Sequence, residues 1–232
     1  MRRFIELSHV IRDDMPSYPG LPRPKITAYL THEESRSRYE GKAEFWISKV
    51  EMIGNTATYL DSPFHRFPNA PDLSSIPLES VAGLEGIVLD ADADNADNAD
   101  NADESKREIR AENLEFEKAE LKDRAVLIRT GWDQRWESEA YWEPGPFLSS
   151  ELAELLIECG VKLVGVDFWN VDDIFDLSRP IHTKLLAANI LIVENLCNLS
   201  ALPRKGFRFY AVPLRIAKGS SIPVRAFAEI DE

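Results

Sequence analysis

Two short stretches, far apart in the chain, carry side chains that could perform acid–base or metal chemistry. The first is Asp-x-Pro-x-His, in which Asp61 and His65 flank Pro63. Because a proline fixes its own φ and pushes the preceding residue toward an extended conformation, we expect these two side chains on an irregular, non-helical segment. The second stretch places His182 before an apolar strand that ends at Glu194. Together the four side chains favour a functional site over an isolated, solvated histidine.

The two stretches resemble the cyclase family of metal-dependent hydrolases, which includes the bacterial kynurenine formamidases (arylformamidases). The family pattern is H-x-G-T-H-x-D-x-P-x-H, followed much later by H-x-x-L-L and by a strand that ends in E-N-L. The chain keeps the Thr, Asp, Pro and last His of the first pattern and both later elements, and the similarity runs from Ile5 to Ile216. It departs at three positions, where Asn55, Ala57 and Tyr59 replace His, Gly and His.

The resemblance implies a metal site that has lost one of its two ions. Asp61 and Glu194 match carboxylates that bridge two metals in the family, and His182 matches a ligand of the second metal. Asn55 and Tyr59 stand where the two imidazoles of the first metal belong. Asn binds transition metals poorly, and Tyr ligates only as a phenolate, at a cost set by its pKa near 10. We therefore expect one divalent ion, Zn²⁺ or Mn²⁺, on the two remaining carboxylates and the imidazole.

Two further residues acquire roles from the same resemblance. His65 matches the general acid/base of the family, and an unperturbed pKa near 6.5 suits an imidazole to that task. Tyr18 matches an aromatic residue that leans over the substrate, where a ring could stack on a flat ligand. Packing of Tyr18 on the protein's own surface is the alternative. The implied reaction is hydrolysis of a small amide, either an N-formyl aryl amine or a cyclic amide, by metal-activated water.

The substituted positions leave two other interpretations open. In one, the protein is a metal-free small-molecule-binding protein, a pseudoenzyme, on the same scaffold. In the other, His182 and Glu194 form a purely structural pair in the core. The presence of Asp61 and His65 beside them in the pattern makes the structural pair the weakest of the three hypotheses.

Bulk composition narrows the function classes. The chain has 232 residues and 44% hydrophobic content, and we expect a single cyclase-like domain over residues 1–232. A net charge of −13 argues against nucleic acid and anionic membranes as partners. The start of the chain lacks the apolar stretch of a signal peptide, and only two cysteines occur, so we expect a cytoplasmic protein. The resemblance implies a homodimer or homotetramer that acts on a small-molecule substrate.

Periodicity predicts a β-rich α/β fold. Residues 149–160 have a Ser cap, helical apolar spacing and a closing Gly, and residues 161–168 form an apolar run typical of a central strand. Residues 33–43 are polar and are predicted to be a surface loop. Residues 91–103 repeat Ala-Asp-Asn with a period of three, which fits neither helix nor strand, and we expect a low-complexity surface loop. The resemblance specifies the fold as a swivelling β/β/α domain.

Overall fold

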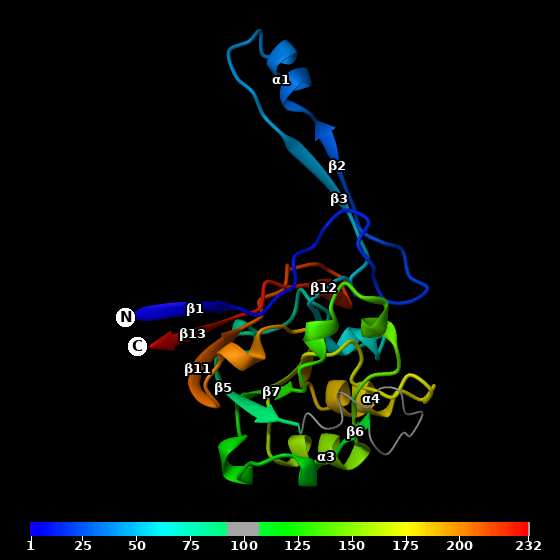
Figure 1. The fold of residues 1–232 in the computed structure, drawn as a ribbon, viewed down its shortest axis with the longest axis vertical. Helices are drawn as coiled ribbons and strands as arrows, with labels where there is room; N and C mark the ends of the chain where they lie inside the picture. Colours follow the sequence, from blue (N-terminus) through cyan, green and yellow to red (C-terminus); the bar gives the residue numbers. More distant parts are fainter. Residues whose placement is uncertain (92–106, 232) are drawn as a thin grey trace.

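The protein is organised around one large mixed sheet, seen in a computed structural model that describes residues 1–91 and 107–231 (Figure 1). In spatial order, its strands are β1 (Arg2–Glu6), β13 (Phe227–Asp231), β11 (Lys205–Tyr210), β5 (Ala82–Asp90), β7 (Ala125–Arg129), β9 (Leu163–Val166), β10 (Leu191–Glu194), β4 (Tyr59–Asp61) and β12 (Ser221–Pro223). Strands β5, β7, β9 and β10 run parallel, and every other neighbouring pair is antiparallel. The predicted β-rich α/β class is confirmed.

Both faces of the central strands are buried, as the apolar runs predicted. Along β7, Val126 and Ile128 belong to one buried cluster, whereas Ala125 and Leu127 belong to the other. Successive side chains of a strand point to opposite faces, so the two clusters lie on the two sides of the sheet. Gly165 in β9 allows close packing, because a Cβ there would stand 2.6 Å from a methyl carbon of Leu196.

Two helices follow from local sequence signals and cover one face. Helix α3 (Ser150–Glu158) confirms the predicted helix, and the Ser149 side chain accepts a hydrogen bond from the backbone N–H of Leu152. Gly160 closes it with a φ of +72°. Helix α4 (Pro180–Ala187) begins with a proline in its first turn and packs against α3 and β10. It was not predicted from the sequence, and it carries His182.

A slender arm projects from the body of the protein at the top of Figure 1. It consists of β2 (Lys25–Leu30), helix α1 (His32–Arg38) and β3 (Ile47–Glu51), and its two strands pair only with each other. The arm exposes large apolar side chains, including Tyr29 at 72% and Trp46 at 53%. The prediction of a loop over residues 33–43 was wrong for its first half, because Thr31 and Glu34 form a capping box that starts α1.

The remaining elements are short. Strands β6 (Glu108–Ile109) and β8 (Phe147–Leu148) pair in parallel, and 3-10 turns occur at η1 (Pro63–His65), η2 (Leu78–Ser80), η4 (Ala111–Asn113), η5 (Lys118–Glu120), η6 (Trp132–Arg135), η7 (Glu139–Trp142) and η8 (Leu199–Ala201). Ala91, the first residue of the predicted repeat loop, still packs in the core, and residues 92–106 lie outside the described part of the chain. Within the described residues, no helix has the length and apolar character needed to span a membrane.

Candidate metal centre

The first sequence stretch lies on an inner strand of the sheet. Asp61 ends β4 and pairs with Ile192 of β10 on one side and Ser221 of β12 on the other. The expectation of an irregular segment was therefore wrong for Asp61, because strand pairing on both sides fixes its backbone. The expectation was right for His65, because this residue lies beyond the strand, in the 3-10 turn η1 that begins at Pro63.

His182 is held from behind by a residue that sequence reasoning missed. The carboxylate of Asp172 accepts hydrogen bonds from the backbone N–H of Ile181, at 2.6 Å, and from that of His182, at 3.3 Å. It also lies 2.5 Å from His182 Nδ1. A carboxylate placed in this way fixes both the tautomer and the ring orientation of an imidazole. The only signal in the sequence was the abundance of Asp in the loop before α4.

The opposite nitrogen of His182 faces two buried carboxylates. His182 Nε2 lies 3.7 Å from Asp61 Oδ2 and 3.6 Å from Glu194 Oε1. Asp61 is fully buried and Glu194 is 1% exposed. The structure thus brings together the acid at 61, the imidazole at 182 and the acid at 194, although more than half the length of the chain separates the first from the other two.

Each carboxylate uses its second oxygen for a hydroxyl. The Tyr59 hydroxyl donates to Glu194 Oε2, and the Ser221 hydroxyl donates to Asp61 Oδ1. Glu194 Oε1 also accepts from the backbone N–H of Val171 at 2.7 Å. Asp61 Oδ2 accepts no hydrogen bond, and among the described residues it is one of two buried side-chain N or O atoms without such a partner. An ionised oxygen buried in this state calls for a cation beside it.

The pKa values of these groups are shifted by burial and by the charges of their close neighbours. Burial would raise the pKa of Asp61, but hydrogen bonding and the charges of His65 and His182 lower it. Burial and the neighbouring Asp61 charge raise the pKa of Glu194. Burial would lower the pKa of His182, yet its hydrogen bond to Asp172 and the charges of Glu194 and Asp61 raise it to about 10. The pKa of Tyr59 is raised well above its usual value by burial and by both carboxylates. Tyr59 is therefore a neutral hydrogen-bond donor.

His65 completes the group from a more exposed position. Its Nδ1 lies 3.0 Å from Ser221 Oγ and 3.6 Å from Asp61 Oδ1, and its side chain is 32% exposed. Ligand atoms of Asp61, His65 and His182 all lie within 4.8 Å of one another, the only such grouping of three potential metal ligands among the described residues. Glu194 falls outside that grouping, although its carboxylate faces His182.

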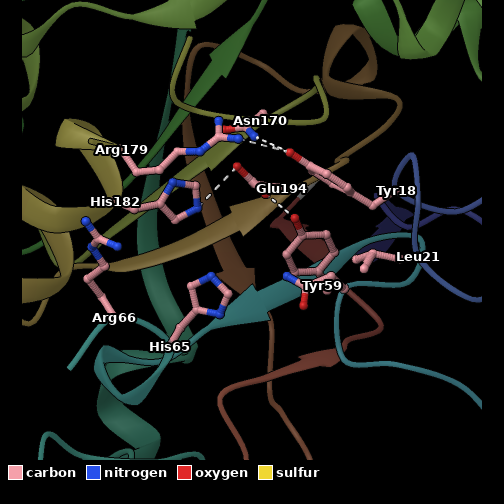
Figure 2. A pocket seen from close by; sticks show the side chains of 10 residues that line it. Tyr18, Leu21, Tyr59, His65, Arg66, Asn170, Arg179, His182 and Glu194 are labelled. Atoms are coloured by element: carbon pink, nitrogen blue, oxygen red, sulfur yellow. Dashed lines mark hydrogen bonds and ion pairs between the residues drawn. The ribbon is translucent and has the colours of Figure 1, made fainter. Parts of the chain in front are cut away.

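A cavity of about 220 Å³ opens above these side chains (Figure 2). It is lined by Tyr18, Leu21, Asn55, Tyr59, His65, Arg66, Asn170, Arg179, His182 and Glu194. The Tyr18 hydroxyl accepts hydrogen bonds from Asn170 Nδ2 at 3.1 Å and from an Arg179 guanidinium nitrogen at 3.4 Å. The Tyr18 ring also makes an edge contact with Trp169, with the centroids 5.2 Å apart. Tyr18 therefore both packs on the protein and faces the cavity, so the two sequence interpretations are compatible.

Another acidic residue at a strand end has a structural task. Asp167 follows β9 and accepts hydrogen bonds from the backbone N–H groups of Thr130 and Gly131 and from the Thr130 hydroxyl. Burial raises the pKa of Asp167 to about 7. Its carboxylate holds the turn after β7, which leads into the buried Trp132. Asp167 is not among the residues that line the cavity.

The chain is similar to known proteins in both sequence and fold. The family model "Putative cyclase" matches residues 5–173. The chain is 26% identical over 223 residues to a kynurenine formamidase of Bacillus cytotoxicus, covering 96% of this chain and 95% of that protein. In three dimensions it matches isatin hydrolase A from Ralstonia solanacearum with a TM-score of 0.83 and 25% identity, over 99% of this chain and 92% of that one.

Further solved structures support the fold alone. Isatin hydrolase A from Labrenzia aggregata, bound to benzyl benzoate, matches with a TM-score of 0.80 and 24% identity, over 100% of this chain and 94% of that one. A potential metal-dependent hydrolase with cyclase activity matches with a TM-score of 0.74 and 20% identity, and each chain is covered completely. These likenesses confirm the predicted fold class. The match to the family model over most of the chain shows that this protein belongs to the cyclase family.

Proposed function

We propose that the protein is a metal-dependent hydrolase that cleaves a small amide, either an N-formyl aryl amine or a cyclic amide. Family membership and the kynurenine formamidase relatives support this reaction class. The observation that carries the proposal is the unpartnered, buried oxygen of Asp61, which faces His182 Nε2. With Glu194 Oε1 on the other side of that nitrogen, the site offers two hard oxygens and one imidazole, a donor set that suits Zn²⁺ or Mn²⁺.

The hydroxyl groups of Tyr59 and Ser221 favour one metal ion at this site over the two that the family pattern implies. Tyr59 and Ser221 each occupy one oxygen of a carboxylate, which leaves Asp61 Oδ2 without a partner and Glu194 Oε1 with only the backbone N–H of Val171. Tyr59 donates to Glu194 and stays neutral, so it is not a substitute for the missing imidazole. Asn55 lines the cavity without a charge to offer. When bound, a divalent ion would lower the pKa of a coordinated water and polarise the scissile carbonyl.

His65 has the position required of a general acid/base. It lines the cavity, and its Nδ1 is engaged with Ser221, so Nε2 is the nitrogen available to a substrate. The Ser221 hydroxyl gives its single hydrogen to Asp61 and therefore accepts one from His65 Nδ1. This arrangement leaves a lone pair on Nε2, as needed to take a proton from water and pass it to the leaving amine.

Metal content and formamidase rate test the proposal together. Protein purified without chelator should contain about one equivalent of zinc or manganese and should hydrolyse formanilide above background. His182→Ala should lose both the metal and the rate. The double substitution Asn55→His and Tyr59→His should add a second equivalent of metal. Metal that stays bound in His182→Ala would contradict the site.

One observation favours the metal-free binding protein as a second candidate. The pKa of His182, raised to about 10, allows an imidazolium to offset part of the charge of the two carboxylates without an ion. In that case the cavity binds a small molecule and performs no hydrolysis. Purified protein without zinc or manganese, and without a formamidase rate when either metal is added, would select this candidate.

We also propose that the protein self-associates, as a dimer or tetramer, through the arm. Residues 25–51 contain five Lys or Arg and five Asp or Glu, so the arm has no net charge and the rest of the chain carries the whole charge of −13. Exposed apolar side chains on an arm without net charge can pack on a second copy without adding charge repulsion. Residues 132–142, which contain three of the five tryptophans, are a poorer candidate for the interface, because Trp132 and Tyr141 are buried in the core.

Light scattering tests this assembly. The unmodified protein should have at least twice the chain mass, and Trp46→Ser with Val50→Ser should shift it toward the monomer. Leu177→Ser, at an 87% exposed residue outside the arm, is the matched control and should change nothing. A monomeric unmodified protein would rule the assembly out.

A further inference from the structure

Two arginine side chains line the cavity on the same side as His182, as Figure 2 shows. Arg66 follows His65 directly, and Arg179 lies immediately before α4. Both come from segments that also supply the candidate catalytic groups. Any molecule close enough to react between His65 and His182 therefore lies near two guanidinium groups.

Neither guanidinium is neutralised by a neighbouring carboxylate. Arg66 donates to Thr183 Oγ1 and to the backbone oxygen of Ser178, both at 2.8 Å. Arg179 donates to the backbone oxygen of Asp173 and to the Tyr18 hydroxyl, both at 3.4 Å. Within the described residues, no Asp or Glu carboxylate oxygen lies within 4.0 Å of either guanidinium, whereas most other arginines have such a partner. The partnered arginines are Arg2, Arg12, Arg23, Arg36, Arg107, Arg110, Arg124, Arg129, Arg204 and Arg225.

Asp176, whose pKa reflects the charge of Arg179, has hydrogen-bond partners of its own. Hydrogen bonds from Ser178 lower the pKa of Asp176, and the charge of Arg179 contributes the smallest part of that shift. The Asp176 carboxylate accepts from the Ser178 hydroxyl at 2.7 Å and from its N–H at 2.9 Å. In a chain of net charge −13, two arginines without ion pairs at one cavity leave a local positive charge that can attract an anion.

The backbone at Arg179 adds a second, independent observation. Arg179 has φ 51° and ψ 59°, in the left-handed region that favours glycine or asparagine. A long, branched cation in this conformation is strained, and such strain is typically kept where the side chain has a task. From this position the guanidinium donates to the Tyr18 hydroxyl at the edge of the cavity.

We propose that the substrate of this site is a small amide that carries a carboxylate, which Arg66 and Arg179 bind at the mouth of the cavity. The proposal rests on the proposed hydrolase function and names its substrate class. Guanidinium groups bind carboxylates through paired, charge-assisted hydrogen bonds. Asp61 and Glu194 are the candidate metal ligands of the floor, so Arg66 and Arg179 are the cavity groups left to bind a carboxylate at the mouth. The substrate therefore enters with its amide toward the floor.

Binding of benzoate and benzamide tests the proposal without requiring catalysis. The two probes have the same shape and differ in charge, and their affinities are measured by calorimetry on the metal-loaded protein. Benzoate should bind at least about tenfold more tightly, and the preference should shrink as ionic strength rises. Arg66→Gln and Arg179→Gln should each remove most of it, and Arg66→Lys should keep part of it. Equal affinities, or a preference that survives both Gln variants, would overturn the proposal.

Two controls distinguish binding by the arginines from ligation of a metal and from misfolding of a variant. A carboxylate can also ligate a metal, so the affinities are measured again on His182→Ala, in which the benzoate preference should persist because both arginines remain. Arg179→Gly suits the left-handed backbone and guards against misfolding, and it should lose the preference while its melting temperature stays unchanged or rises. A preference that disappears in His182→Ala but survives in Arg179→Gly would assign benzoate to the metal and overturn the proposal.

Hydrolysis of a matched pair distinguishes this proposal from the hydrolase function. N-formylanthranilate carries a carboxylate that formanilide lacks, and we expect its kcat/KM to be at least about tenfold higher. Equal hydrolysis of both would leave the hydrolase standing and overturn the carboxylate preference. If the protein hydrolyses neither compound but still prefers benzoate, the proposed hydrolase function is contradicted and the anion-binding site remains supported.

Discussion

The floor and the mouth of the cavity are built by different means. The floor consists of Asp61, Glu194 and Tyr59 on paired strands, with His182 on a helix packed against them, and all four are buried. The mouth consists of side chains from turns and loops, which are partly exposed; they are Tyr18, His65, Arg66 and Arg179. The floor is acidic and the mouth is basic. This division gives the cavity a rigid floor, to which we assign the chemistry, and a mouth, to which we assign the choice of substrate.

Substitution of Asp172 should produce the largest effect and test how far the floor depends on its support. In Asp172→Asn, His182 loses the anion that fixes its tautomer and raises its basicity. Metal affinity should fall by about 10- to 100-fold, the usual cost of such a change. Competition with a chelating dye measures it. Arg66→Gln at the mouth is the matched control, and an equal loss of metal there would erase the distinction between floor and mouth.

Substitution of Tyr59 tests the floor through stability. Tyr59→Phe removes the hydroxyl that donates to Glu194 Oε2 and leaves that oxygen buried without this hydrogen bond. The free energy of unfolding should fall by about 1–3 kcal/mol, as measured by urea denaturation. Tyr29→Phe, at a 72% exposed residue of the arm, should have no measurable effect. Unchanged stability in Tyr59→Phe would mean that the hydroxyl contact contributes nothing.

The charge of His182 predicts a pH dependence in metal-free protein. The folded-state pKa of His182 is raised to about 10, above the ordinary value of 6.5. The folded state therefore binds the proton more tightly than the unfolded state. Its contribution to stability is complete below about pH 6.5 and is lost as pH rises toward 10. Urea denaturation in chelator between these limits measures the decline, which His182→Gln should abolish. Metal loading should reverse the slope, because the ion replaces the proton.

Relief of strain at Arg179 should have the smallest effect on stability. Arg179→Gly places a residue without a Cβ in the left-handed conformation, and the melting temperature should change little or rise by a few degrees. Differential scanning calorimetry measures this change. A clear loss of stability would show that the Arg179 side chain supports the fold, and the contrast between a structural floor and a selective mouth would weaken.

The same division explains what could be predicted from the sequence. The four chemical groups at 61, 65, 182 and 194 were predicted because their spacing follows a family pattern, and β10 and α3 because their apolar periods are regular. The supporting residues were missed. Asp172 and Ser221 act through contacts between segments far apart in the chain, and local periodicity carries no trace of such contacts.

The unpaired arginines and the arm were missed for a related reason. Ion pairs depend on three-dimensional neighbours, so the lack of a partner at Arg66 or Arg179 cannot be seen in a linear sequence. The alternation of apolar and polar side chains around β3 is typical of a strand, yet that pattern does not show whether the strand joins the nine-stranded sheet or stands apart. Helix α1 was masked by its polar composition, and only the Thr31–Glu34 capping box marks its start.

The separate pairing of β2 with β3 allows the arm to unfold independently of the rest of the protein. No other strand among the described residues shares a ladder with these two, so the arm can melt without breaking a hydrogen bond of the nine-stranded sheet. An isolated two-stranded ribbon is only marginally stable in water. In the monomer, backbone amides of the arm should therefore exchange with deuterium long before those of β7 and β9. Local fraying at one end of the molecule would leave the cavity intact.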